Sequence, residues 1–223
     1  MDDGLQRYAA SRATERGAAS YDTKYERELH KRISDSIERR VIARAFATAP
    51  GPYASALDVP CGAGRITTEV ARHIGGTLVE ADFSPTMLGR AREHARSTGA
   101  CGARRYVRLD ALRLPFADRA FDLVFSARLS HHIGVEEDRE RWLVELFRVA
   151  RRTVIATVFD HYSLKNIWRI ARAPFSRKRG KNTLKIARVR DLARQSGFEL
   201  EAAIPLSRIF SGHRYLVLAR REA

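Results

Sequence analysis

The sequence predicts an α/β protein with a doubly wound, mostly parallel sheet, and three observations support this fold class. Short apolar stretches alternate with longer helical patterns after residue 52. A glycine-containing turn at 57–65 joins the first of these stretches to the first helical pattern. Only Pro205 to Arg214 separates the last two apolar stretches, which is too short for a helical crossover. The final pair of strands should therefore be antiparallel, and the other strands parallel.

The region before the sheet divides into two parts. Residues 1–20 are polar, rich in Ala and Arg, and lack periodic apolar positions, so a flexible N-terminus is expected. Residues 21–50 should form a helical arm that ends at the Pro-Gly-Pro stop after Ala49. Its apolar positions recur with a period near 3.6, at Ile33, Ile37, Val41, Ile42 and Phe46.

Residues 51–223 are then assigned to one domain with seven strands. The strands are expected at 56–59, 77–81, 105–109, 121–126, 153–159, 199–204 and 215–219. The helices between them are expected at 64–74, 86–97, 138–150 and 189–195. The 223 residues are 44% hydrophobic, which suffices for one domain with a sizeable core.

Composition limits the cellular setting and the class of partner. No apolar run approaches the length of a membrane span, and the start lacks the pattern of a signal peptide, so a cytoplasmic protein is expected. Two cysteines, Cys61 and Cys101, make neither a disulfide framework nor a zinc site, and no metal is expected. The formal net charge of +15 favours nucleic acid, an anionic membrane surface or an anionic substrate as partner.

Three acidic residues stand at the ends of successive predicted strands: Asp58, Asp82 and Asp110. In an open parallel sheet the ligand crevice lies outside the carboxyl ends of the strands, so these three side chains should converge on one site. A carboxylate can accept hydrogen bonds from both vicinal hydroxyls of a ribose, and another can accept one from an exocyclic amine. The spacing therefore predicts a site for a nucleoside.

With these motifs the chain resembles the class I S-adenosylmethionine-dependent methyltransferases, near the branch that includes quinone-biosynthesis methyltransferases. The matching segments are Leu57 to Arg65, Asp82 to Leu88, Asp110 to Phe116, and Phe121 to Ser126. The resemblance implies a Rossmann-like seven-stranded mixed sheet of order 3-2-1-4-5-7-6, with the last strand antiparallel. It also implies S-adenosylmethionine as the methyl donor and S-adenosylhomocysteine as the product.

The resemblance assigns cofactor contacts to individual residues. Asp58, Gly62 and Gly64 would surround the methionine portion, Asp82 would bind the ribose, and Asp110 with Ala111 would bind the adenine. Pro60 stands where the family often has a glycine, and because proline has no N–H the turn must rely on the later glycines. The remaining expected cofactor contacts are Pro60, Arg65, Phe83, Ser126, and, from the helical arm, Tyr21 and Tyr25.

A nicotinamide dinucleotide is the competing cofactor. Its fingerprint needs a third glycine, which the segment from Gly62 to Thr67 lacks, and it would not require the acid at the end of the third strand. A tight turn with no ligand would leave all three acids unexplained. The methyl donor is therefore the preferred ligand.

The methyl acceptor should lie beside the loop after the fourth strand, Ala127 to Ile133. This loop lacks the Asn/Asp-Pro-Pro-Tyr motif of enzymes that methylate base amines, and Cys61 is misplaced for cytosine C5 chemistry. A hydroxyl acceptor would need a general base, and the candidates are His132, His131 and His161. The alternative is that these histidines are structural hydrogen-bonding residues.

Residues 163–190 carry ten positive residues and no acid, and the first half has apolar residues at helical spacing. We interpret 160–187 as a basic lid over the acceptor; a core helix followed by a solvated loop is the alternative. The expected acceptor is an oxygen of a small or lipid-linked anionic metabolite. An RNA-directed methyltransferase and a non-catalytic cofactor-binding protein are the other hypotheses. The protein is expected as a monomer or homodimer, either free in the cytoplasm or peripheral at the inner face of the membrane.

Overall fold

The computed structural model describes residues 29–49, 51–99, 102–172, 182–207 and 211–221. The predicted flexible N-terminus, the first part of the helical arm with Tyr21 and Tyr25, and much of the basic segment lie outside these ranges.

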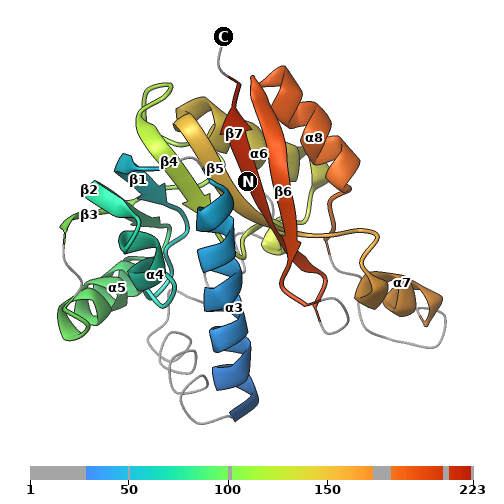
Figure 1. Ribbon diagram of the computed structural model, residues 1–223, viewed down its shortest axis with the longest axis horizontal. Coiled ribbons are helices and arrows are strands. Elements are labelled where there is room, and N and C mark those ends of the chain that lie inside the picture. The colour runs from blue at the N-terminus through green and yellow to red at the C-terminus, as the bar shows by residue number, and fades with distance from the viewer. Residues whose placement is uncertain (1–28, 50, 100–101, 173–181, 208–210, 222–223) are drawn as a thin grey trace.

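A seven-stranded mixed sheet forms the centre of the molecule (Figure 1), in the order β3-β2-β1-β4-β5-β7-β6. Its strands are β1 (Tyr53–Asp58), β2 (Ile74–Asp82), β3 (Ala103–Arg108), β4 (Phe121–Ser126), β5 (Ala150–Phe159), β6 (Phe198–Pro205) and β7 (His213–Arg220). The five strands from β1 to β5 pair in parallel, and β7 is antiparallel to both β5 and β6. The fold class, the strand order and the antiparallel final strand predicted from the sequence are confirmed.

Helices cover both faces of this sheet. They are α3 (Leu29–Thr48), α4 (Thr67–Ala71), α5 (Pro85–Ser97), α6 (Glu136–Val149), α7 (Leu164–Ala171) and α8 (Ile186–Gln195), with a short 3-10 helix, η1, at Ser130–His132. Figure 1 shows α3 in front of the sheet and α6 behind it, and α3 contacts β6 and β7. α5 packs on β2 and β3, and α8 packs on β6.

The alternation of strand side chains divides the core into two layers. In β4, Val124 joins the layer beneath α6 and α8, whereas Leu123 and Phe125 face the layer beneath α3. Trp142 of α6 and Ile42 of α3 are fully buried in these two layers. The central strands β4 and β5 are therefore buried along nearly their whole length, because both faces of the sheet are covered there.

The positions of α3 that are buried differ from those predicted from the sequence. Ile33 and Ile37 are 54% and 37% exposed, although the periodicity placed them on the buried face. Glu38 is buried instead, at 1% exposure, beside Val41 and Ile42. The buried apolar stripe thus begins at Val41, about two turns later than predicted. The first part of the helix extends beyond the carboxyl edge of the sheet (Figure 1).

Two helices are shorter than their sequence patterns suggested. The pattern over 64–74 gives only α4, Thr67–Ala71, because β2 already begins at Ile74. The apolar spacing after Ser163 gives the eight residues of α7, capped by the Ser163 hydroxyl, which accepts a hydrogen bond from the Asn166 N–H. Within the described ranges, no helix is long and apolar enough to cross a lipid bilayer.

Candidate functional site

A pocket opens where the carboxyl ends of β1, β2, β3 and β4 meet. The three strand-end acids, Asp58, Asp82 and Asp110, all line it, as their predicted convergence requires. The other lining residues are Val59, Pro60, Cys61, Gly62, Ala63, Arg65, Ile66, Phe83, Ser84, Met87, Leu109, Ala111, Phe125, Ala127, Arg128 and Leu129. Carboxylates therefore stand at intervals along a largely apolar wall, an arrangement suited to an extended ligand with an aromatic end and polar groups.

The turn after β1 depends on glycines with positive φ. Gly62 and Gly64 have φ angles of 56° and 78°, a region that residues with a Cβ adopt at a cost. The Gly64 N–H donates to the Cys61 carbonyl oxygen at 3.1 Å, which closes the turn. Pro60 lines the pocket without donating an N–H, so the conformation of this turn does rest on the later glycines.

Gly64 is expected to be intolerant of a side chain. A Cβ built on it would lie 3.1 Å from the Ala91 Cα, and its φ is already in the left-handed region. Gly64→Ala should therefore lower the free energy of unfolding by about 2 kcal/mol. Chemical denaturation would measure this loss. Gly89→Ala, on an exposed part of α5 with open space around it, is the matched control and should stabilise the fold by about 1 kcal/mol. Equal effects of the two substitutions would contradict this view of the turn.

Asp82 is held in a fixed orientation by the main chain. Its Oδ1 accepts a hydrogen bond from the Ser84 N–H at 2.8 Å, and its Oδ2 accepts one from the Gly62 N–H at 3.0 Å. The carboxylate thus joins the turn after β1 to the loop after β2 while it faces the pocket. A carboxylate has two oxygens that accept hydrogen bonds, so Asp82 is chemically suited to bind two adjacent hydroxyls.

The far end of the pocket is suited to a planar heterocycle. The Asp110 Oδ1 accepts a hydrogen bond from the Leu112 N–H at 2.9 Å, which orients this carboxylate at the end of β3. Ala111 and Leu109 line the wall beside it, and Phe83, 39% exposed, lines the pocket from the next loop. An aromatic base placed here would have apolar contacts on its faces and an acceptor at its edge.

Burial affects the ionisation of Asp58. Burial raises the pKa of its carboxyl group to about 8, the hydrogen bond from the Thr67 hydroxyl opposes this rise, and the negative charges of Glu80 and Asp82 add to it. The Thr67 Oγ1 lies 2.7 Å from the Asp58 Oδ2. At neutral pH the protein with no ligand therefore holds Asp58 mainly in its protonated form, and a cation in the pocket would favour the carboxylate.

Several other predicted contacts have structural partners of their own. Gly64 is outside the pocket lining and packs against α5. Ser126 is fully buried, and its hydroxyl donates to the Val59 carbonyl oxygen. Arg65 lines the pocket, but its guanidinium pairs with Asp35 and Glu38 of α3. Tyr21 and Tyr25 lie outside the described residues.

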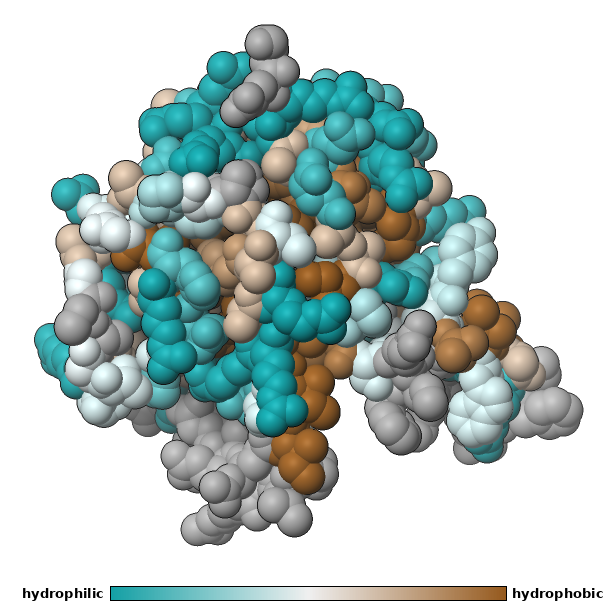
Figure 2. All heavy atoms as spheres, viewed as in Figure 1, coloured by the Kyte–Doolittle hydropathy of each residue, from teal (hydrophilic) through white to brown (hydrophobic). Residues whose placement is uncertain are grey.

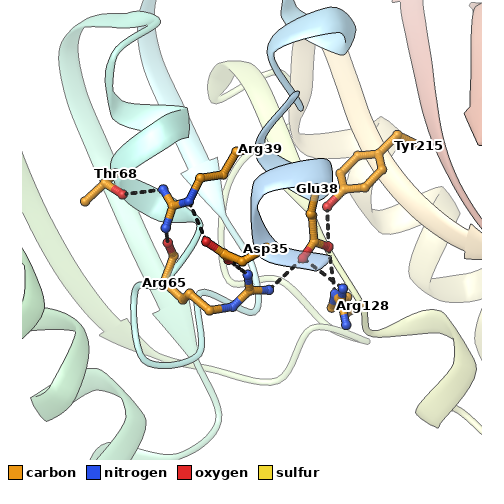
Figure 3. A network of polar contacts seen from close by, with 7 residues as sticks. All are labelled: Asp35, Glu38, Arg39, Arg65, Thr68, Arg128 and Tyr215. Carbon is orange, nitrogen blue, oxygen red and sulfur yellow. Dashed lines mark hydrogen bonds and ion pairs between the residues drawn. The ribbon is translucent and has the colours of Figure 1, made fainter. Parts of the chain in front are cut away.

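Arg65 belongs to a polar network that joins α3 to the pocket (Figure 3). At its centre the Glu38 carboxylate accepts hydrogen bonds from Arg128 at 2.7 and 2.8 Å, from Arg65 at 2.8 Å and from the Tyr215 hydroxyl at 2.9 Å. Burial alone would raise the pKa of Glu38, but the two guanidinium groups prevail and lower it to about 2. Arg39 extends the network, because it donates to the Arg65 carbonyl oxygen at 2.9 Å and pairs with Asp35.

Arg128 is the functional candidate that sequence reasoning missed. It follows β4, lines the pocket, and has a φ of 61°, which is uncommon for a residue with a side chain. Its main-chain N–H donates to the Thr157 hydroxyl at 2.5 Å, and Glu38 fixes its guanidinium. A residue held at positive φ beside a pocket is typical of functional sites. Glu38 itself had a signal in the sequence, because it is an acid in register with the apolar residues Val41, Ile42, Ala45 and Phe46.

None of the three candidate histidines is among the described residues that line this pocket. The His131 and His132 rings, in η1, are 4.0 Å apart, and His131 also contacts the His213 ring of β7. The His161 Nδ1 is 2.9 Å from the Thr183 hydroxyl oxygen. A role for any of them as general base stays a prediction. Among the described residues, no cluster of His, Cys, Asp and Glu could hold a metal ion.

Comparison with known proteins finds methyltransferases that are similar to part of this chain. Residues 56–153, from β1 into β5, match the model of a methyltransferase domain. This part of the chain is therefore similar to a methyltransferase domain. A 2-phytyl-1,4-naphtoquinone methyltransferase of Nostoc punctiforme is 32% identical over 114 residues, which are 50% of this chain and 48% of that protein. A ubiquinone/menaquinone biosynthesis C-methyltransferase of Cronobacter sakazakii is 35% identical over 97 residues, 43% of this chain and 38% of the relative. The methyltransferase domain thus aligns with about half or less of these curated relatives.

Solved structures extend the likeness of the fold over nearly the whole chain. A magnesium protoporphyrin IX methyltransferase from Synechocystis PCC 6803, crystallised with S-adenosylhomocysteine, superimposes with a TM-score of 0.79 over 97% of this chain and 100% of that one, at 16% identity. The [4+2]-cyclase SpnF has a TM-score of 0.64 over 83% of this chain and 81% of that one, also at 16% identity. The fold of the methyltransferase domain therefore includes α3 and the strands after β5.

Proposed function

We propose that the protein transfers a methyl group from S-adenosylmethionine to an oxygen of a small or lipid-linked anionic metabolite. The observation that supports the donor most strongly is the convergence of Asp58, Asp82 and Asp110 on one pocket with the glycine turn. Crystallised neighbours of the same fold contain this donor or its product. S-adenosylmethionine supplies an activated methyl group on a sulfonium, so the protein has mainly to position the two substrates.

Different residues of the pocket would bind different parts of this donor. Asp82 would accept hydrogen bonds from the ribose hydroxyls, and Asp110 from the adenine amine. Asp58 lies at the other end of the turn, where the ammonium of the methionine portion would draw its carboxyl group into the ionised form. The apolar residues along the wall would keep water from the reacting atoms.

Arg128 supports an anionic acceptor. It stands at the β4 end of the pocket, where its Nε and one terminal nitrogen donate to the Glu38 carboxylate. The guanidinium has further N–H groups that could donate to a ligand. A guanidinium held in this way can position a carboxylate or another ionised oxygen. An oxygen that is already ionised needs no general base, which agrees with a pocket whose described lining contains Arg128 and no histidine.

The histidine variants distinguish an ionised acceptor from a neutral hydroxyl. At saturating donor, His132→Ala and His161→Ala should each retain kcat within about threefold, because a general base contributes at least about a hundredfold and neither ring lines the pocket. Steady-state kinetics with the identified acceptor would measure this. A fall of more than about tenfold in either variant would assign that histidine as the base for a hydroxyl.

Transfer of labelled methyl groups tests the class of acceptor. We expect label in an extract of lipids and small metabolites, with the methyl group on oxygen. The name of the Cronobacter relative favours carbon as a second candidate, and product analysis would show a methyl bound to carbon. More label in total RNA than in this extract would support the RNA-directed alternative. Donor binding with no labelled acceptor in either extract would support the non-catalytic alternative.

A further inference from the structure

The amphipathic helix α7 is oriented in an unusual way. Leu164, Ile167, Trp168 and Ile170 are 63%, 49%, 64% and 53% exposed, so its apolar side faces away from the protein. Two of its polar residues face inward: Asn166 is buried and donates to the His161 carbonyl oxygen at 2.8 Å, while the Arg169 guanidinium lies over the Phe159 ring. A helix on the surface of a soluble domain normally has the opposite arrangement. Apolar contacts within the described part of the chain therefore do not explain the position of α7.

The apolar surface continues on the same edge of the molecule. Tyr162, just before α7, is 63% exposed, and Ile33 and Ile37 are exposed on the part of α3 that extends beyond the sheet. Figure 1 shows that α3 and α7 both project past the carboxyl ends of the strands, and Figure 2 shows hydrophobic surface on each of them with a hollow between. This is the edge at which the pocket opens. Exposed apolar clusters of this kind mark interaction sites.

The charge around α7 indicates what covers it. The 28 residues from Ser163 to Arg190 contain ten Lys and Arg residues and no acid, in a chain of net charge +15. Within α7 and its end, Arg172 is exposed and its guanidinium stacks on the Trp168 ring, 4.4 Å from the centroid. Tryptophan and basic residues beside an apolar helical face are typical of helices that lie in the interface of an anionic bilayer.

We propose that α7 docks the protein on an anionic lipid bilayer, with the side of Leu164, Ile167 and Trp168 inserted below the headgroups. The carboxyl edge of the sheet would then face the membrane, and the pocket would open toward it. The inference does not depend on methyl transfer, since lipid binding can be measured without donor or acceptor. A lipid-linked acceptor, if the proposed function holds, could reach the pocket from the bilayer surface.

Sedimentation with vesicles tests the proposal on the full chain. Wild-type protein should sediment with vesicles of phosphatidylglycerol and phosphatidylcholine, and far less with phosphatidylcholine alone, because positive charge near the surface contributes to binding. Ile167→Asp should weaken this partition by about tenfold or more. Val144→Asp is the matched control, with the same change of charge at a position of α6 that is 41% exposed, and should bind nearly as wild type.

Tryptophan emission reports insertion directly. The chain has two tryptophans, of which Trp142 is fully buried in the core and Trp168 is exposed on α7. Binding to the anionic vesicles should shift the emission to shorter wavelength, and Trp168→Phe should abolish the shift while the protein still sediments.

Three results would overturn the proposal. Wild-type protein could fail to sediment with the anionic vesicles, or Ile167→Asp could bind them as well as Val144→Asp. Alternatively, wild-type protein could fail to bind lipid while Ile167→Asp converts a dimer to a monomer in analytical ultracentrifugation. This result would show that the face of α7 is a contact between two copies of the chain. Circular dichroism and donor binding should be unchanged in Ile167→Asp, because Ile167 is half exposed and outside the described lining of the pocket.

Discussion

Replacement of Asp82 by alanine is expected to weaken the binding of S-adenosylmethionine by about a hundredfold or more. Two hydrogen bonds between a carboxylate and the ribose hydroxyls would be lost, and each charge-assisted bond contributes about 1.5 kcal/mol or more. The substitution also removes the acceptor for the Gly62 and Ser84 N–H groups, which lie 3.0 and 2.8 Å from the carboxylate. Isothermal titration calorimetry of both proteins would measure the change in Kd.

Two further variants sharpen this experiment. Asp82→Asn retains one oxygen that can accept a hydrogen bond from the Ser84 or the Gly62 N–H, whereas its amide nitrogen cannot accept the other bond. Its loss of affinity should therefore be smaller than that of Asp82→Ala. Asp191→Ala removes an exposed carboxylate on α8, outside the pocket lining, and should leave Kd unchanged. An Asp82→Ala protein that binds the donor as tightly as wild type would contradict the assignment of this pocket.

Replacement of Glu38 by glutamine is expected to cause the largest loss of stability, about 3 kcal/mol in the free energy of unfolding. The partly buried guanidinium groups of Arg128 and Arg65 would lose their common counter-charge, the buried Glu38 carboxylate, and an ion pair of this kind broken on one side costs about this amount. For a domain of this size the melting temperature should fall by about 10 °C. Glu137→Gln, an exposed carboxylate of α6, should change stability by less than about 0.5 kcal/mol.

The free energy of unfolding should also depend on pH in a way that reflects the ion pairs of Glu38. The folded protein holds the pKa of Glu38 at about 2, below its usual value of 4.5. The stabilising contribution is therefore fully present above pH 4.5 and is lost as the pH falls toward 2. Urea unfolding of wild type and Glu38→Gln should give free energies that converge over this interval. Parallel curves from pH 6 to pH 3 would show that Glu38 is not held as a carboxylate by Arg128 and Arg65.

The sheet could be predicted from the sequence because its signals are local. Most strands contain a short apolar stretch, and the short interval between β6 and β7 requires an antiparallel pair. The acids at the ends of β1, β2 and β3 converge because parallel strands end at the same edge, so Asp58, Asp82 and Asp110 could also be placed.

The rest of the site depends on contacts between residues far apart in the chain. Glu38 and Arg128 are 90 residues apart, and only the packing of α3 on the sheet brings them together. A positive φ is usually found at glycine, so the conformation of Arg128 could not be predicted from its residue type. The same packing explains why Ile33 and Ile37 are exposed although their spacing predicted burial, since α3 continues past the edge of the sheet that it covers.

A crystal structure with S-adenosylhomocysteine would test the central claim most directly, namely that this pocket holds the methyl donor. We expect the ribose hydroxyls within hydrogen-bonding distance of Asp82, the adenine beside Asp110 and Ala111, and the sulfur directed toward the β4 end, where Arg128 and Leu129 line the wall. Soaked or co-crystallised product bound elsewhere, or bound here with the ribose away from Asp82, would contradict the claim.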